Sequence, residues 1–168
     1  MSAIEKLHLC ENKTLKITNA LIRENSAHEK DEKRSIYMMD AYIKTKGVLT
    51  KGPFITYSSG IIGIENGNPI ICSQFIMQLL EPLNHCETPY IFKSEIRAGP
   101  CLFVRFTGSQ NNLNYAYAKI GVHAFENDIK LDGSSYTVFV TQSEENAVID
   151  IFMPTRKEED SNEAVFSE

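Results

Sequence analysis

The chain has 168 residues, of which 42% are hydrophobic and 23% are charged, and its formal net charge at pH 7 is −5. This composition excludes a disordered chain, and the length suits one domain or two tightly joined halves. The acidic balance offers phosphates no basic surface, so we expect no direct binding to nucleic acid. No segment approaches the roughly 20 apolar residues of a membrane span, and the first residues lack a signal-peptide pattern. We therefore expect a cytoplasmic protein with no membrane contact.

The two ends of the chain differ from its body. Residues 156–168 hold five acidic and two basic side chains, which indicates a disordered acidic tail. Residues 1–11 are expected to form an N-terminal extension, with a short helix from Ser2 to Cys10. The domain itself is expected over residues 12–155.

The four cysteines offer neither a disulfide framework nor a metal site. Cys10, Cys72, Cys86 and Cys101 form no CxxC pair, and a chain of this size needs no covalent cross-links. The spacing of Cys72, His85 and Cys86 does not suit zinc. We therefore expect free, mostly buried thiols, no metal and no cofactor.

The first half of the domain shows the pattern of one strand, one helix and two further strands. The predicted elements are a strand over 15–23, a helix that begins at a capping box over 26–29, and strands over 54–58 and 69–77. The helix carries an apolar stripe of Ile36, Met39 and Ile43 and ends at Gly47, a residue that suits a helix C-terminus.

The same order returns in the second half. The predicted elements are a strand over 91–106 interrupted at 98–100, a helix after Gly108-Ser109, and strands over 136–140 and 148–153. The apolar stripe of this helix consists of Leu113, Tyr117, Ile120 and Ala124. Met39 corresponds to Ile120 and Gly52 to Gly133, an offset of 81, and the closing strands correspond at an offset of 78.

This repetition predicts an internal duplication, with halves of about 12–80 and 87–155. Each half is too small to bury its apolar face alone, so both are expected to join in one α+β domain. The predicted architecture is a mainly antiparallel sheet with both helices on one face. The opposite face would form a concave seam, where we expect a ligand groove between the halves.

Several segments of the second half resemble one known family. They are Gly99-Pro100-Cys101, Phe106-Thr107-Gly108, Leu131 to Tyr136 and Asp150 to Pro154. In this order they are similar to the GyrI-like effector-binding domains found in MerR-type and AraC-type multidrug-responsive transcription regulators and in the DNA gyrase inhibitor. The likeness extends over residues 12–155 and is clearest after residue 97.

The resemblance implies a domain that binds small organic ligands of amphipathic or cationic aromatic type. It also implies a protein partner, which would be a regulator or gyrase. The family's regulators carry a DNA-binding helix-turn-helix region before this domain, whereas here only 14 residues precede the first predicted strand. We therefore expect any DNA recognition to come from a partner. Trp is absent, so Tyr and Phe would supply all aromatic surface.

A pocket for an aromatic cation needs flat apolar walls and a carboxylate without a basic partner. The candidate walls are Phe54, Tyr57, Phe92, Tyr136, Phe139 and Phe152. Core packing is the competing explanation for each ring, because aromatic residues mostly fill cores. Strand alternation puts Phe54 and Tyr57 on opposite faces, so they cannot both belong to one core layer.

Asp150 and Glu95 are the candidate acids. Asp150 lies between two isoleucines in a predicted strand, where Asp is disfavoured. In the family resemblance this position is often acidic and can face the groove. Its counterpart in the first half, by the offset of 78, is Cys72. Simple solvent exposure is the alternative for both acids, with Arg97 and Arg105 as neutralising partners.

An enzyme is the alternative from a different class. The chain shows no nucleophile elbow, no HExxH motif and no Gly-rich phosphate loop, so no catalytic residue is assigned. Some GyrI-like proteins resemble hydrolases of strained electrophiles, in which Asp150 or Glu95 with Tyr136 would act through a carboxyl group of raised pKa. A third possibility is a module that inhibits a DNA-processing enzyme by binding to it.

Overall fold

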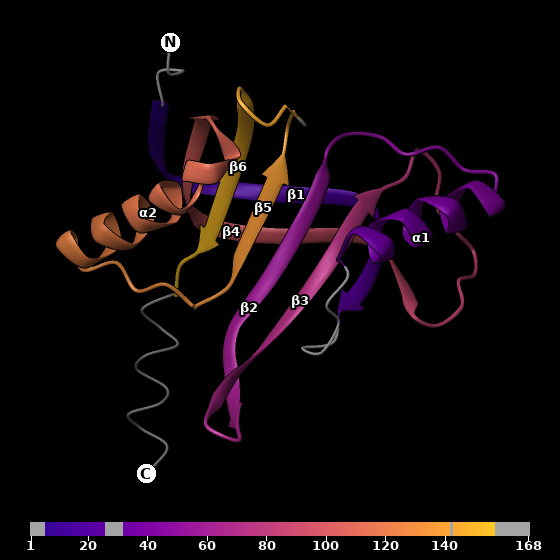
Figure 1. The fold of residues 1–168 in the computed structure, drawn as a ribbon, viewed down its shortest axis with the longest axis horizontal. Coiled ribbons are helices and arrows are strands. Elements are labelled where there is room, and N and C mark those ends of the chain that lie inside the picture. The colour runs from indigo at the N-terminus through magenta and orange to yellow at the C-terminus, as the bar shows by residue number, and fades with distance from the viewer. Residues whose placement is uncertain (1–5, 26–31, 142, 157–168) are drawn as a thin grey trace.

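The computed structural model describes residues 6–25, 32–141 and 143–156, and its elements follow the predicted order twice (Figure 1). The elements are β1 (Lys6–Asn25), α1 (Glu32–Thr45), β2 (Phe54–Glu65), β3 (Asn68–Gln78), β4 (Tyr90–Gly108), the 3-10 helix η1 (Gln110–Asn112), α2 (Asn114–Glu126), β5 (Ser135–Phe139) and β6 (Ala147–Pro154). The α+β class and the order of elements are confirmed, whereas common descent of the halves stays a prediction. The capping box at 26–29 and the tail over 157–168 lie outside the described residues.

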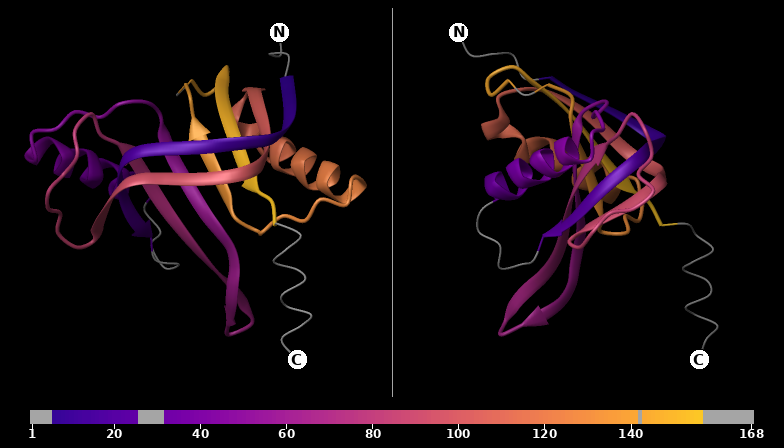
Figure 2. Two further views of the ribbon diagram at one scale, coloured as in Figure 1. Left: turned by 180° about the vertical axis from the view of Figure 1, so that it is seen from behind. Right: turned by 90° about the vertical axis from the view of Figure 1, so that its right-hand side faces the viewer.

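All six strands pair in antiparallel fashion and close into a ring in the order β1-β3-β2-β5-β6-β4. The two longest strands, β1 and β4, pair with each other from Lys6 and Thr107 to Arg23 and Tyr90. This β1–β4 ribbon runs behind the other four strands and spans both halves (Figure 1, Figure 2). Because the pairing begins at residue 6, the helix expected over 2–10 is wrong for residues 6–10.

The strand break predicted at 98–100 is a bend within β4. The register of β1 against β4 shifts between Cys10 and Leu15. Next to this irregularity, a Cβ atom on Gly99 would lie 2.7 Å from Thr14 Oγ1, so only glycine fits. The Gly-Pro signal therefore marks a close approach of the two long strands and not the end of one.

The two helices are seated on the strands in the same way. The buried residues of α1 and α2 form two sets offset by 81, namely Ser35, Met39 and Ile43 against Ala116, Ile120 and Ala124. Thr56 and Thr137, also 81 apart, pair directly between β2 and β5. When a residue pairs with its own counterpart, a two-fold axis passes between the two residues. The predicted correspondence of the helices is confirmed, and a pseudo-two-fold axis passes through this threonine pair.

The offset predicted for the closing strands is wrong. Thr56 pairs with Phe75 and Thr137 pairs with Ile151, so β3 and β6 correspond at an offset of 76. The cause is the β2–β3 hairpin, whose register shifts twice along its length. These irregularities lengthen the hairpin, and counting from turn to turn in the sequence does not detect them.

Both helices cover the same side of the strands (Figure 2). One apolar cluster packs beneath α2 and another beneath α1. A third cluster fills the interior of the ring, between the β1–β4 ribbon and the other strands, and consists of Ile17, Ala20, Ile22, Ile55, Ile76 and Val138. The open seam expected on the face opposite the helices is therefore wrong, because the ring closes over that face. No helix of the described residues is long and apolar enough to cross a membrane.

Candidate functional site

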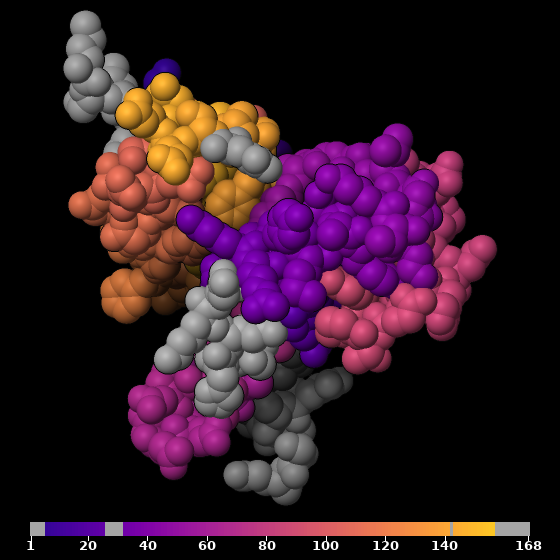
Figure 3. Space-filling view, turned by 45° about the vertical axis from the view of Figure 1, so that its right-hand side comes forward, coloured from indigo at the N-terminus to yellow at the C-terminus, as the bar shows by residue number. Residues whose placement is uncertain are grey.

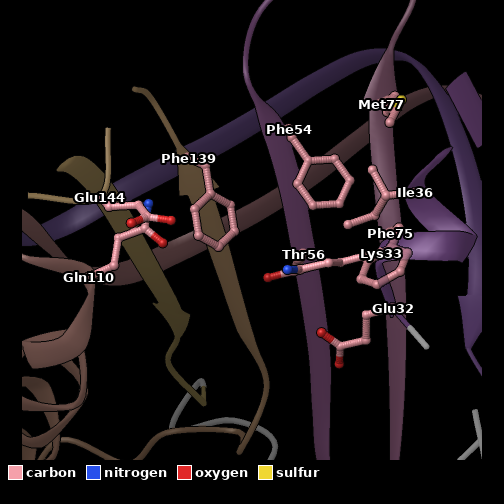
Figure 4. A pocket seen from close by; sticks show the side chains of 10 residues that line it. All are labelled: Glu32, Lys33, Ile36, Phe54, Thr56, Phe75, Met77, Gln110, Phe139 and Glu144. Carbon is pink, nitrogen blue, oxygen red and sulfur yellow. The ribbon is translucent and has the colours of Figure 1, made fainter. Parts of the chain in front are cut away.

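A cavity of about 500 Å³ opens on the helix side of the strands, and Figure 3 shows a furrow between purple α1 and the orange and yellow second half. The lining residues are Glu32, Lys33 and Ile36 of α1, Phe54 and Thr56 of β2, Phe75 and Met77 of β3, Gln110 of η1, Phe139 of β5, and Glu144 of the β5–β6 loop (Figure 4). The cavity thus lies between the halves, as expected for the groove, but on the side that carries the helices.

Three phenylalanine rings form the strand side of the cavity. Phe54 and Phe139 are direct partners in the β2–β5 pairing, and their ring centroids lie 6.1 Å apart. The Phe75 ring on β3 lies 5.4 Å from that of Phe54 and is tilted by 52°. Tilted and offset rings present both their faces and their edges to a ligand. The site can therefore pack against a planar aromatic group.

Charged groups stand at the mouth of the cavity. Glu32, Lys33 and Glu144 are exposed, and Figure 4 shows Glu144 beside Gln110, across the cavity from Glu32. The Gln110 backbone N–H donates to the Glu144 carbonyl oxygen at 3.0 Å, which holds η1 against the loop. Among the described residues that line the cavity, two carboxylates and one ammonium stand at the mouth, and this balance favours cationic or neutral ligands over anions.

The two halves differ at the helix position that faces the threonine pair. Ile36 of α1 corresponds to Tyr117 of α2 by the offset of 81. The Tyr117 hydroxyl hydrogen-bonds to Thr137 Oγ1 at 2.5 Å and covers it. Ile36 is shorter and has no hydroxyl, and both it and Thr56 line the cavity. The cavity is therefore the unfilled counterpart of the space that Tyr117 occupies.

The predicted aromatic residues divide between the two sides of the strands. On the helix side lie Phe54, Phe92 and Phe139, and towards the ring interior lie Tyr57, Tyr136 and Phe152. Phe92 belongs to the cluster beneath α1 and does not line the cavity. Tyr57 and Tyr136 pack with centroids 4.8 Å apart. The structure thus brings two of the six predicted rings together in the cavity.

Asp150 has a basic partner. Arg105 lies opposite it in the β4–β6 pairing and donates from Nε to Oδ1 and from Nη2 to Oδ2, each at 2.8 Å. The Asp150 side chain is 11% exposed. This two-pronged contact supplies the carboxylate with charge-assisted hydrogen bonds, which is the neutralising arrangement considered for Arg105.

A polar pair occupies the same place in the first half. By the offset of 76, the counterpart of Asp150 is Gln74 and not Cys72, as predicted from the sequence. Gln74 Nε2 donates to Glu24 Oε1 at 3.3 Å, across the β1–β3 pairing. Because both halves hold a side-chain pair at this point, joining neighbouring strands is a sufficient explanation for Asp150.

Glu95 lies on the outer surface of the β1–β4 ribbon, away from the cavity. Its carboxylate is 3.2 Å from Lys16 Nζ and 3.5 Å from an Arg97 guanidinium nitrogen. The hydrogen bond from Lys16 and the two positive charges lower the pKa of Glu95. This direction is opposite to the raised pKa that the hydrolase hypothesis considered above requires of its carboxyl group.

Titratable side chains also gather around Asp132, in the segment before β5. Asp132 Oδ1 accepts hydrogen bonds from the backbone N–H and the hydroxyl of Ser134, at 2.8 and 2.6 Å. Burial raises the pKa of Tyr136 to about 12 and that of the Cys101 thiol to about 11, so both stay protonated at neutral pH.

The cysteines agree with the predictions only in part. All four thiols are free, but Cys101 alone is buried, which corrects the expectation that most are. Among the residues that the structure describes, no three potential metal ligands cluster.

Sequence reasoning does not assign most of the cavity lining. The residues it misses are Glu32, Lys33, Ile36, Thr56, Phe75, Met77, Gln110 and Glu144. Phe75 and Met77 alternate along their strand, which is the available signal that they share a face. The face itself depends on how β3 is paired with β1 and β2, and the sequence pattern does not reveal that pairing.

No protein-family model matches the chain, and no curated protein is significantly similar to it in sequence. Solved structures do share its fold. The C-terminal domain of EcmrR is 14% identical with a TM-score of 0.63, and the match covers 92% of this chain and 99% of that domain. EcmrR in a complex with DNA is 15% identical with a TM-score of 0.62, over 91% of this chain and 58% of that one. This chain therefore spans little more than half the length of the EcmrR chain.

A hydrolase from Listeria innocua also has this fold, with 10% identity and a TM-score of 0.52, over 90% of this chain and 92% of that one. At such identities the likeness establishes the fold alone. The fold of the EcmrR C-terminal domain agrees with the fold that the GyrI-like resemblance implies.

Proposed function

We propose that this protein is an effector-type domain that binds a small organic molecule in the cavity between α1 and the β5–β6 loop. The observation that carries the proposal is a cavity of about 500 Å³ with three phenylalanine rings on one side. Sites for small molecules are typically of this size, mostly apolar, with a few polar groups that fix orientation. Here Thr56 and Gln110 supply uncharged polar groups.

The preferred ligand is a flat, apolar molecule that is neutral or carries one positive charge. Its aromatic part packs against Phe54 and Phe139, while its charged or polar end lies at the mouth, near Glu32 and Glu144. A cation near these carboxylates gains Coulomb energy, and an anion loses it. Lys33 at the same mouth reduces this preference without reversing it.

The shared fold of the EcmrR C-terminal domain supports a role in regulation. In that role the bound molecule alters a contact with a DNA-binding region or with a partner that has one. The acidic balance of the chain agrees with this division of labour, because the chain offers phosphates no basic surface.

The experiment is a thermal-shift screen with lipophilic cations, neutral aromatics and anionic controls. A ligand at 100 times its dissociation constant stabilises the fold by about 2.7 kcal/mol, which a melting curve resolves. The diagnostic variant is Ile36→Tyr, which copies Tyr117 into the first half and fills the space above Thr56. We expect it to fold normally and to lose the ligand-induced shift. Tyr37→Ala, on the outer side of α1 where Tyr37 is 74% exposed, is the matched control and keeps the shift.

Charge is tested separately from shape. Glu32→Gln and Glu144→Gln are expected to reduce the preference for cations over neutral analogues, whereas Lys33→Gln is expected to increase it. A shift that survives Ile36→Tyr undiminished would put the ligand elsewhere. No shift from any compound in the panel would count against a small-molecule function.

A further inference from the structure

A second, smaller cavity of about 170 Å³ adjoins the cavity of the proposed ligand site. Phe54 and Met77 line both cavities, so these two side chains lie at the boundary between them. In Figure 4 both lie at the end of the larger cavity that is remote from Glu32. The smaller cavity therefore extends the proposed site beyond that end.

Helix α1 borders both cavities. Ile36 lines the larger cavity and Asp40 lines the smaller one. Residues four apart lie on the same side of a helix, separated by about 6 Å along its axis. A ligand whose ring packs near Ile36 and Phe54 therefore reaches Asp40 with an arm of about 6 Å.

The smaller cavity is the more polar of the two. Asp40, Thr50 and Gln78 line it, and Asp40 is the one charged side chain among the described residues that do so. The Gln78 side chain is held in place, because its Oε1 accepts a hydrogen bond from the Thr18 backbone N–H at 3.2 Å. A carboxylate only accepts hydrogen bonds, so Asp40 favours a ligand group that donates them and carries positive charge.

Asp40 has a basic neighbour on its own helix. Lys44 Nζ lies 3.0 Å from Asp40 Oδ2, and the two side chains are 77% and 47% exposed. Exposed ion pairs of this kind are weak, and a carboxylate has acceptor sites for several donors. A ligand ammonium group can therefore bind Asp40 beside Lys44 or in its place.

The second half differs from the first at these positions. Thr50 bridges to Leu79, and Leu131 bridges in the same way to Thr155, which confirms that Thr50 and Leu131 correspond. Leu131 packs against the apolar cluster beneath α2, and the counterpart of Asp40 is Gly121. The polar character of the smaller cavity is thus specific to the half that holds the proposed ligand site.

We propose that the ligand is an elongated aromatic amine. Its ring packs against Phe54 in the larger cavity, and an arm of about 6 Å carries a basic nitrogen to the Asp40 carboxylate in the smaller one. The amine supplies the single positive charge, and the end that lies at the mouth near Glu32 and Glu144 is polar and uncharged. This inference rests on the proposed function and narrows its class of ligand.

The test is titration calorimetry with three naphthalene probes. One carries a primary amine on an arm of about 6 Å, one carries the amine on a very short arm, and one carries an alcohol on the longer arm. We expect the longer-armed amine to bind roughly tenfold more tightly than either of the others, and Asp40→Asn to remove this advantage without weakening the alcohol. Glu126→Gln is the matched control, because it removes the same charge from an exposed position on α2 and should leave all three affinities as they are.

Thr50→Leu, which copies Leu131, tests the space in the smaller cavity. It should weaken both longer-armed probes and spare the short-armed amine, and the melting temperature of each variant without ligand verifies its folding. Equal affinities for the longer-armed amine and alcohol, or no response to Asp40→Asn, overturn this inference and leave the proposed function intact. The same holds if the three probes fail while other compounds of the thermal-shift panel bind. Failure of the whole panel as well overturns both proposals.

Discussion

The two halves of this protein hold their helices in the same way and use the surroundings of those helices differently. In the second half the Tyr117 hydroxyl bonds to Thr137 and covers it. In the first half Ile36 and Thr56 line a cavity. On the outer side, α2 exposes Tyr115, Val122 and Phe125, whereas the corresponding positions of α1 include Arg34 and Lys44. The two halves therefore differ in the side chains around their helices, although the helices are seated alike.

Removing one core side chain from each helix tests whether the two helices are seated alike. Met39 and Ile120 are fully buried at equivalent positions. Met39→Ala and Ile120→Ala are each expected to lower the free energy of unfolding by about 3 kcal/mol, through lost burial and the cavity left behind. Urea unfolding measures both, with Val122→Ala as an exposed control that costs about 0.5 kcal/mol or less. A large cost in only one helix would show that the halves are not seated alike.

A second substitution isolates the hydrogen bond that closes the second half. Thr137 is 3% exposed, and its hydroxyl is paired with that of Tyr117. Tyr117→Phe keeps the ring and leaves the threonine hydroxyl without this partner, so we expect a loss of about 1 kcal/mol in unfolding experiments. If Tyr117→Phe were neutral, the ring alone would account for the closed second half.

Tyr117→Ile gives the second half the residue that the first half has at the corresponding position. It should cost about 2 kcal/mol through lost burial and open space above Thr137. The counterparts of Phe139 and Phe54 around that space are Ser58 and Ser135, so the new space lacks the aromatic side. Titration calorimetry with a ligand found in the screen should still give one molecule bound per chain. Two bound molecules per chain would mean that the open space above the threonine is sufficient for binding and that the phenylalanine rings are not required.

The contacts that follow α1 make the stability of the fold depend on pH. The Tyr42 hydroxyl and Lys46 both bind the Glu87 carboxylate, and these hydrogen bonds lower the pKa of Glu87 from 4.5 to about 2. Since the pKa is lower in the folded state, the stabilisation is complete above pH 4.5 and is lost as the pH falls towards 2. Glu87→Gln should therefore flatten the decline of unfolding free energy between these pH values. Glu65→Gln in the hairpin serves as the exposed control, and equal slopes for wild type and Glu87→Gln would contradict the prediction.

The buried face of each helix was predictable from the sequence because it depends on local periodicity. The stripe of Ile36, Met39 and Ile43 identified the buried side of α1, and the offset of 81 carried it onto α2. The closed ring was not predictable, because the partner of each long strand lies far along the chain and pairing leaves no local signal. For the same reason, residues 6–10 were expected in a helix, although they pair with β4.

The candidate site was predictable only for Phe54 and Phe139, which line the cavity. Asp150 was selected because an acid is unusual in a buried strand, and the structure accounts for it with Arg105 on the neighbouring strand. The position of the cavity depends on which helix side chain lies over each member of the Thr56–Thr137 pair, and that side chain comes from a different element. No pattern within one segment contains that relation.

The β1–β4 ribbon has a consequence for how the chain is made. Lys6 pairs with Thr107, and Arg23 pairs with Tyr90. The residues between β1 and β4 must therefore form a long loop when these two strands pair. During translation β1 leaves the ribosome before β4, so the edge of β1 that pairs with β4 stays unpaired until β4 has been synthesised. The two halves therefore cannot complete their folding one after the other. We expect folding to be slow and to be completed only after the second half has been synthesised.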